Sequence, residues 1–459
     1  MGGESLSVQQ EATAVAGQNL ANVNNPAYAD EQVQLQEATP LDTTIGEEGT
    51  GVQAVSITSL RNALLDAQIA AEGSVTGSLT SQQSALQDAE AYLDEQLSSS
   101  SSSSDSGASS SNGLTADLSN LYSSLETLST NPSNISDRQA VIQAAQQVAE
   151  QFNEVSSGLN TVNAGLNSSI QNGVNAVNQD FSEIASLNQQ IMDVQAGGGT
   201  AEQLVDQREQ LIENLSGYVD VTTSTQANGA VNVDINGANF VSDGTRTNDL
   251  STYSDNNQLY VGTSFGSDLT LTGGSIEGSI TARDGTLATL QNSLNTLAGQ
   301  FINQVNTVYE QGTDLNGDTD QLFFTGSGAA DIAVNSTLLS DPSTFQASST
   351  GEPGDNGVVL QLLQLADTPS ASLNNQTFSQ YYTQAVGSFG SSLQSVNDQL
   401  DNSNSVAQML TQQRASASGV DTDTEMTNLL QFQKAYEASA ELISTVNKML
   451  ETVLGMKTE

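Results

Sequence analysis

The chain of 459 residues is long enough for two to four domains with buried cores. Its 53 Asp and Glu residues face only nine Lys and Arg, which gives a formal charge of −44, and cations so few and scattered exclude a surface built for nucleic acid or for an anionic membrane. Because Cys, His and Trp are all absent, disulfides, thiolate or His-ligated metal sites and catalysis by a Ser-His-Asp arrangement are excluded as well.

The first predicted element is an amphipathic helix that ends before Pro26. The residues at its start carry neither the basic region nor the apolar run of a cleavable signal peptide, so none is expected. Elsewhere, too, no stretch approaches the roughly 18 apolar residues of a membrane span. One face of the helix is formed by small and branched apolar residues at helical spacing, namely Val8, Ala12, Val15, Ala16, Leu20 and Val23.

Helical spacing, with apolar residues alternately three and four apart, dominates the next part of the chain and recurs later. In the longest such run the apolar residues from Val148 to Val194 recur about every 3.5 residues, the coiled-coil period, and Ser136 is a candidate N-cap. The expected fold is therefore mainly α, an elongated antiparallel helical bundle or coiled coil with a smaller β part. Helices are predicted over about 61–97, 114–128, 136–195, 287–308 and 378–400.

The centre of the chain changes to the alternation typical of strands, and a small inserted β domain is predicted over 217–283. Asn228-Gly229 and Asn236-Gly237 separate strand candidates, and Asn-Gly favours the positive φ angles of tight hairpin turns. The strand candidates are Val219 with Val221, the alternating Val231, Val233 and Ile235, and the short ranges 259–261, 269–271 and 276–280.

Two low-complexity stretches are predicted to be exposed loops, the serine run Ser98–Ser104 with its extension to Gly113, and the range of about 312–356. The second contains four oxygen-bearing residues spaced like the start of a calcium loop: Asp314, Asn316, Asp318 and Asp320. The Gly and Glu that such a loop requires are replaced by Thr319 and Thr325, so an Asp/Gly turn is the preferred interpretation and no metal site is predicted.

The last predicted helix covers Asp421 to Met456 and is again amphipathic. Two interpretations of the terminal helices are open on this pattern alone: docking on the chain's own core, or pairing with each other and with neighbouring subunits. The apolar stripe of the last helix consists of Leu429, Phe432, Tyr436, Ile443, Val446, Leu450 and Val453.

Short motifs at both ends of the chain resemble signatures of the bacterial flagellar rod, hook and hook-associated proteins. Residues 16–28, AGQNLANVNNPAY, resemble the N-terminal signature, and residues 418–436 with the tail 443–454 resemble the C-terminal one. Ala27 stands where the family usually has Gly, and Ala29-Asp30-Glu31 replaces a basic residue that is usual there. Three internal segments are similar to the hook-associated proteins that join hook to filament: 184–191, 204–211 and 273–278.

This resemblance implies a structural protein without enzymatic activity or cofactor, exported through the flagellar type III apparatus to the hook–filament junction outside the cell. It also implies that the terminal helices pair and assemble into a tube. Their interface residues would be Val8, Ala12, Val15, Leu20, Val23 and Tyr28 in the first helix, and Leu429, Phe432, Tyr436, Ile443, Val446, Leu450 and Val453 in the last.

The resemblance further implies an organisation and a set of partners. A terminal assembly domain would comprise 1–40 with 405–459, a helical bundle 41–216 with 284–404, and the β domain 217–283. The expected partners are the hook protein, hook-associated protein 3, other copies of the chain, and an export chaperone on the C-terminal region. Nucleic acid and membrane are not expected.

Other functions stay open at this point. The chain could be a different flagellar axial protein, such as the hook protein or hook-associated protein 3, or a secreted acidic adhesin or binding module with its bundle as a stalk. An enzyme is not expected, because nothing marks out two of the carboxylates as a catalytic pair and the residues of a His-Glu-x-x-His metal site are missing.

Overall fold

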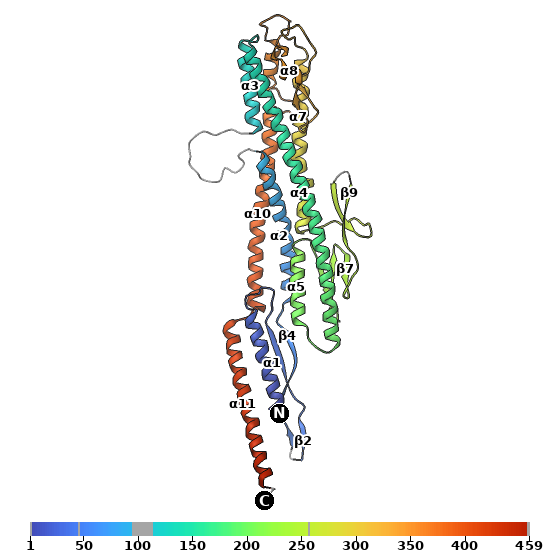
Figure 1. The fold of residues 1–459 in the computed structure, drawn as a ribbon, viewed down its shortest axis with the longest axis vertical. Helices are drawn as coiled ribbons and strands as arrows, with labels where there is room; N and C mark the ends of the chain where they lie inside the picture. The colour runs from blue at the N-terminus through green and yellow to red at the C-terminus, as the bar shows by residue number, and fades with distance from the viewer. Residues whose placement is uncertain (1, 45, 94–112, 256–257, 457–459) are drawn as a thin grey trace. The chain divides into compact units, whose positions relative to one another are not determined.

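The computed structural model describes residues 2–44, 46–93, 113–255 and 258–456 (Figure 1). The prediction of a mainly α fold with a smaller β part is confirmed, since most of these residues are helical and the strands form small antiparallel sheets. The chain divides into two compact units. Unit 1 comprises Met1–Ser78, Gln171–Glu277 and Asp401–Glu459, and unit 2 comprises Leu79–Ile170 and Gly278–Leu400. The three-part division stays a prediction.

Unit 1 combines helices with all but one of the small sheets. Helices α2, α4, α6 and α10 contribute residues to both units. The helices in unit 1 are α1 (Gly2–Ala21), α2 (Ala63–Leu93), α4 (Ile135–Ala196), α5 (Glu202–Ser216), α6 (Gly274–Thr281), α10 (Phe378–Ser418) and α11 (Thr422–Met456). The strands are β1 (Glu31–Glu37), β2 (Leu41–Thr43), β3 (Gly46–Glu48), β4 (Val52–Ser59), β5 (Thr222–Thr225), β6 (Val231–Ile235), β7 (Ala238–Ser242), β8 (Thr245–Arg246), β9 (Leu250–Asp255) and β10 (Gln258–Thr263).

Unit 2 is a helical bundle. It adds to the shared helices α3 (Leu114–Thr130), a π-helical turn (Ala282–Leu287), α7 (Ala288–Tyr309), α8 (Ser336–Ser340), α9 (Gly357–Gln364) and the short strands β11 (Phe324–Thr325) and β12 (Ala333–Val334). Two 3₁₀ turns cover Pro342–Thr344 and Ala371–Leu373.

The long helices of unit 2 pack antiparallel, as predicted. Phe152 of α4 lies near Phe301 of α7, with ring centroids 6.4 Å apart, and Asn163 further along α4 donates to Gln291 earlier in α7 at 3.4 Å. Residue numbers thus rise along one helix as they fall along the other. The 3.5-residue spacing of apolar side chains keeps one face of α4 on its neighbours throughout this contact.

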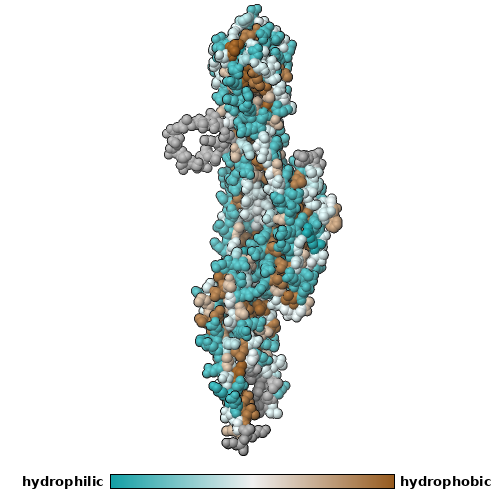
Figure 2. Space-filling view, in the orientation of Figure 1, coloured by the Kyte–Doolittle hydropathy of each residue, from teal (hydrophilic) through white to brown (hydrophobic). Residues whose placement is uncertain are grey.

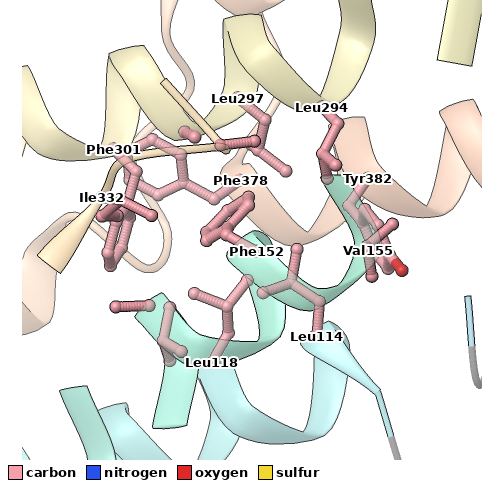
Figure 3. Packing of buried hydrophobic residues seen from close by; sticks show 14 of the residues in the cluster. Leu114, Leu118, Phe152, Val155, Leu294, Leu297, Phe301, Ile332, Phe378 and Tyr382 are labelled. Atoms are coloured by element: carbon pink, nitrogen blue, oxygen red, sulfur yellow. The ribbon is translucent and has the colours of Figure 1, made fainter. Parts of the chain in front are cut away.

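The core of unit 2 is rich in aromatic rings (Figure 3). Phe301 meets Phe378 edge to face at 5.2 Å and Phe324 in a tilted arrangement at 5.3 Å. The range 312–356 supplies part of this core, so its prediction as an exposed loop was wrong. The Gly, Asp and Ser residues between its apolar positions suggested a loop, yet several large side chains of this range are buried: Phe323, Phe324, Ile332, Leu338 and Phe345.

The four-stranded sheet of unit 1 runs in the order β5-β6-β7-β8 and packs on α4. Phe240 of β7 stacks on Phe181 of α4 with ring centroids 5.0 Å apart. The predicted tight turn at Asn236-Gly237 is confirmed, because both residues have positive φ, 45° and 80°, and they connect β6 to β7 directly. Strand β5 begins at Thr222, after the valines at 219 and 221 that had been candidates.

Two other strand predictions in this region were wrong. Ile276 and Ile280 lie in helix α6, because two apolar residues four positions apart share one face of a helix. Residues 269–271 form no strand, although Leu269 donates its N–H to the Val261 carbonyl at 3.2 Å. Helix α6 begins at Gly274, where φ is +83° and an added Cβ would lie 2.2 Å from the Tyr218 carbonyl group, so only glycine fits.

The start of α4 and the ribbon β1–β4 also differ from expectation. Helix α4 begins at Ile135, and Asn134 rather than Ser136 is its N-cap, since the Asn134 side chain accepts the N–H of Ser136 at 2.9 Å. The antiparallel ribbon β1–β4 was not predicted, although Val33 and Leu35 alternate with glutamines in β1 as expected of a strand. The serine run 98–104 lies outside the described residues, as does its extension as far as residue 112.

The aspartate-rich segment after α7 forms a turn, as preferred from the sequence. Asp314 Oδ1 accepts the backbone N–H groups of Asn316 at 2.7 Å and Asp318 at 2.8 Å. This carboxylate therefore stabilises the local backbone.

Candidate assembly site

Helices α1 and α11 lie side by side, so the predicted pairing of the chain ends is confirmed (Figure 1). The two helices are antiparallel. Ser5 and Ser439 join their hydroxyl groups at 3.2 Å, and Asn19 reaches Glu425 at 3.1 Å. At the other end of the pair Gly2 permits close packing, because an added Cβ would lie 2.7 Å from the Ile443 side chain.

The predicted interface residues of the first helix divide into two groups. Val8, Ala12 and Val15 are buried where α1 meets α11, β1 and β4, and Tyr28 is buried just after the helix. Leu20 and Val23 are half-buried. The structure thus brings most of this set into contact within a single chain.

The predicted residues of α11 differ in their exposure. Leu429, Phe432 and Ile443 are half-buried at positions that face α1. The remaining members of the stripe are exposed, and their exposed fraction reaches 63% at Val453. Figure 2 shows hydrophobic residues at the surface along the terminal helices. These exposed members are Tyr436, Val446, Leu450 and Val453, and Met449, Leu454 and Met456 lie exposed beside them.

A buried polar residue, Asn19, joins α1 to the segments around it. Its side-chain Nδ2 donates to Asp30 Oδ1 at 2.5 Å, to the Glu31 carbonyl at 2.9 Å and to Glu425 Oε2 at 3.1 Å. Its Oδ1 accepts the Tyr28 hydroxyl at 2.7 Å and the Glu31 backbone N–H at 3.1 Å. With 1% of its surface exposed, Asn19 has all its polar atoms satisfied by protein.

Backbone contacts extend this network to the ends of β4 and α10. The Asp30 N–H donates to the Ser418 carbonyl at 2.8 Å, and the Leu60 N–H donates to the Asp30 carbonyl at 2.8 Å. The Ser418 hydroxyl in turn donates to the Leu60 carbonyl at 2.9 Å, so the three residues are linked in a ring of hydrogen bonds. Three segments far apart in sequence are therefore tied at one point.

Arg61 brings α5 into the same arrangement. Its guanidinium donates to the Ala27 carbonyl at 2.7 Å, to Asp206 Oδ1 at 2.6 Å and to Asp66 Oδ2 at 3.0 Å. We call the set Asn19, Tyr28, Asp30, Glu31, Arg61, Asp206, Ser418 and Glu425 the terminal clasp. It connects α1 and α11 to β1, α5 and the end of α10.

Acidic groups in the clasp titrate abnormally. Burial, with the carboxylates of Asp206, Glu202 and Asp30 adding to it, raises the pKa of Glu31 to about 7. Burial also raises the pKa of Asp30, and burial together with nearby carboxylates raises the pKa of the Tyr28 hydroxyl, which stays a donor to Asn19.

Sequence reasoning missed most of the clasp. Only Tyr28 was among the predicted site residues. One signal was available, because Asn19 continues the spacing of Val8, Ala12 and Val15 on the apolar face of α1, and a lone Asn in such a stripe indicates a buried polar contact. The partners of Asn19 come from separate segments and could not be read from spacing.

Comparison with known proteins finds two family models that match parts of the chain. The family model for the helical domain of flagellar hook-associated protein FlgK matches residues 101–324, and the model for the C-terminal region of the flagellar basal body rod FlgEFG proteins matches residues 411–456. The second match covers the whole of α11. The chain is thus similar to the flagellar hook-associated proteins.

Individual hook-associated proteins are similar to this chain to different extents. Flagellar hook-associated protein 1 of Bacillus subtilis is 29% identical, over 98% of this chain and 96% of that protein. The Escherichia coli protein of the same name is 23% identical, over 63% of this chain and 71% of its own length. A solved structure, the flagellar hook junction protein FlgK from Burkholderia pseudomallei, is 25% identical with a TM-score of 0.49, covering 56% of this chain and 46% of that one.

No group of three or more acidic side chains among the described residues is placed to hold a metal ion. No helix in this part of the chain is long and apolar enough to cross a membrane.

Proposed function

We propose that this chain is a structural component of the bacterial flagellum that joins the hook to the filament, and that α1 and α11 carry the contacts by which it assembles. The match to hook-associated proteins over nearly the whole chain supports the first part. It also favours this function over the hook protein, hook-associated protein 3 and a secreted adhesin. The exposed apolar stripe of α11 supports the second part.

Burial of the exposed apolar stripe of α11 by a partner would be energetically favourable. Val446, Leu450 and Val453 are exposed in the isolated chain, and full burial of such side chains stabilises by about 1.5–3 kcal/mol each. Neighbouring subunits related by a rotation and a rise would cover this face and propagate the same contact as a tube. The predicted interface residues of α1 serve the pair itself, because three of them are already buried against α11 and the ribbon.

The proposed partners of the chain are the hook protein on one side, hook-associated protein 3 on the other, and copies of the chain within the junction. An export chaperone would cover the apolar stripe of α11 before assembly, since such a stripe left exposed favours aggregation. Export through the flagellar type III apparatus would place the protein outside the cell.

The test is attachment of gold-labelled protein to the tips of isolated hooks, seen by negative-stain electron microscopy. The interface variant replaces Val446, Leu450 and Val453 with Ser. A matched control replaces Glu441, Lys448 and Thr452 with Ser on the opposite side of the same exposed stretch. Both variants alter exposed residues only, so both should fold like the parent chain.

We expect the parent chain and the control to label the distal hook tips. The interface variant should lose at least about nine-tenths of the labelling, because a loss of ~1.4 kcal/mol of binding free energy weakens the affinity tenfold. Hook tips labelled equally by all three proteins would exclude the stripe as the assembly contact. Absence of labelling by the parent chain would contradict the junction function itself.

A further inference from the structure

Two carboxylates of the terminal clasp are buried with an unpaired oxygen each. Glu31 is 5% exposed and Asp206 is 7% exposed. Glu31 Oε1 and Asp206 Oδ2 have no hydrogen-bond partner, although a buried ionised carboxylate normally has all its oxygens satisfied. A proton bound to one of these oxygens would remove both the negative charge of that carboxylate and its unpaired acceptor.

Negative groups surround Glu31 on several elements. Asp30 precedes it in the chain, Glu202 and Asp206 face it from α5, and Glu425 of α11 acts on the adjoining Asp30. The Tyr28 hydroxyl, which stays protonated, is the other titratable group beside it.

The positive charges near the cluster are already engaged. Arg61 binds Asp206 and Asp66, and Arg414 of α10 binds Glu213 at 2.7 Å. Arg208 of α5 binds its neighbour Glu209 at 3.1 Å. Carboxylates therefore outnumber guanidinium groups around Glu31, and ionisation of Glu31 adds a charge that no described cation compensates.

We propose that the terminal clasp is a proton-dependent latch, which holds α1 and the β1–β4 ribbon on α5 while Glu31 carries a proton and loosens when Glu31 ionises. The closed state needs a neutral Glu31 side chain, because its backbone groups are fixed on Asn19 and its carboxyl is enclosed by the other acids. In the loosened state the ribbon leaves α5 and water solvates the Glu31 carboxylate.

The pH range follows from linkage. In the closed state the pKa of Glu31 is raised to about 7, whereas in the open state it returns to its ordinary value of 4.5. Below pH 4.5 both states hold the proton, so closure is most stable there. Between pH 4.5 and 7 only the closed state holds it, and each unit of rising pH favours opening by up to tenfold. Above pH 7 neither state holds it and the effect levels off.

Hydrogen–deuterium exchange of the full chain, corrected for the intrinsic effect of pH, measures this opening. The reporting amides are those of Asp30, Glu31 and Leu60, which are hydrogen-bonded within the clasp. Amides of α7 in unit 2 provide an internal reference. The test variant is Glu31→Gln, which keeps the shape without the charge, and the matched control is Glu37→Gln at an exposed position of the same strand.

In the parent chain we expect the opening constant of the clasp to rise at least about tenfold from pH 5 to pH 7, with less than a threefold change in α7. Glu37→Gln should repeat this profile. Glu31→Gln should keep the clasp closed across the range, with less than a threefold change.

Three results would overturn the latch. The first is a flat profile in the parent chain, which decides the matter even if Glu31→Gln fails to fold. The second is an unchanged pH dependence in Glu31→Gln. The third is full restoration of protection at pH 7 by added Ca²⁺ or Mg²⁺, which would mean that a metal ion, not a proton, neutralises the cluster. The isolated chain is used throughout, so the outcome does not depend on the proposed flagellar function.

Discussion

The side-chain amide of Asn19 lies 3.1 Å from Oε2 of Glu425, although 406 residues separate them along the chain. This contact fixes the register of α1 on α11 at one end of the pair, and the Ser5–Ser439 contact fixes it at the other. Because a buried amide placed next to a carboxylate is costly to misalign, the polar contact specifies one alignment of two otherwise similar apolar stripes.

Replacing Asn19 with Ala should open the terminal pair. The Tyr28 hydroxyl and the Glu31 N–H would lose their buried partner, which costs about 2–4 kcal/mol in total. The free energy of opening, measured by hydrogen exchange of α1 amides, should fall by that amount. Asn22→Ala is the matched control, since the Asn22 side chain donates to the Gln18 carbonyl one turn away at the end of α1, and it should cost less than about 1 kcal/mol. Similar losses in both variants would contradict a special role for Asn19.

Replacing Phe301 with Ala should destabilise unit 2 strongly. The ring is fully buried among Phe152, Phe324 and Phe378. Its removal leaves a cavity that should lower the unfolding free energy by about 3–5 kcal/mol. Calorimetry should show a lower melting temperature for the transition of unit 2. Phe265→Ala removes the same ring from a turn where 79% of it is exposed, and should change stability by less than about 0.5 kcal/mol.

Arg138 is expected to stabilise unit 2 through hydrogen bonds rather than an ion pair. Its buried guanidinium donates to the carbonyls of Pro132 at 2.7 Å, Ser343 at 3.2 Å and Phe345. Arg138→Met would leave these acceptors unpaired and should lower the unfolding free energy of unit 2 by about 2–4 kcal/mol in urea titrations.

The control for Arg138 is Arg246→Met, which removes a partly exposed guanidinium paired with Asp249. Such a pair is worth less than about 1 kcal/mol. A loss of unfolding free energy in unit 1 from Arg246→Met as large as the loss in unit 2 from Arg138→Met would show that charge, not burial of the carbonyls, determines the effect.

The segment 348–357 should loosen in acid because of Asp355. Slight burial acts to raise the pKa of this carboxyl, but donors from Ser349 and Thr350, such as the Ser349 N–H at 2.7 Å, outweigh it and hold the pKa well below its usual range. A lowered pKa stabilises the folded segment above the ordinary value of 3.8, and the stabilisation is lost as the pH falls below that value.

The measurement for Asp355 is hydrogen exchange of the Ser349 and Thr350 amides between pH 3 and pH 6. Protection in the parent chain should decrease toward pH 3. In Asp355→Asn it should be low at pH 6 already and nearly independent of pH, because the amide accepts fewer of these donors. Protection in the variant equal to that of the parent at pH 6 would contradict this account.

The sequence was sufficient for the helices whose apolar residues recur regularly. Helix α4 was predicted at 136–195 and spans Ile135–Ala196, because one unbroken apolar stripe defines a helix over its whole length. The secondary structure of short segments was harder to predict. Two isoleucines four apart at 276 and 280 fit a helix, yet they were assigned to a strand because predicted strands precede them. The range 312–356 was misread because its buried aromatic side chains stand between turn residues.

The clasp could not be predicted in the same way. Its members are single polar residues from the end of α1, the start of β1, the segment before α2, helix α5 and the start of α11. Spacing along the chain records which residues share a helix face, but it does not record which distant segments meet. Burial of Glu31 and Asp206 is a property of that meeting, and composition alone would place both on the surface.

Unit 1 is made of three stretches of chain, and the last of them begins only at Asp401. During synthesis from the N-terminus, α1 exists for hundreds of residues before α11 is available to cover its buried face. A chain that stops between Leu400 and Glu425 contains all of unit 2 but cannot close the clasp. Closure of the clasp therefore has to wait for the start of α11, and it distinguishes chains that include Glu425 from chains that stop before it.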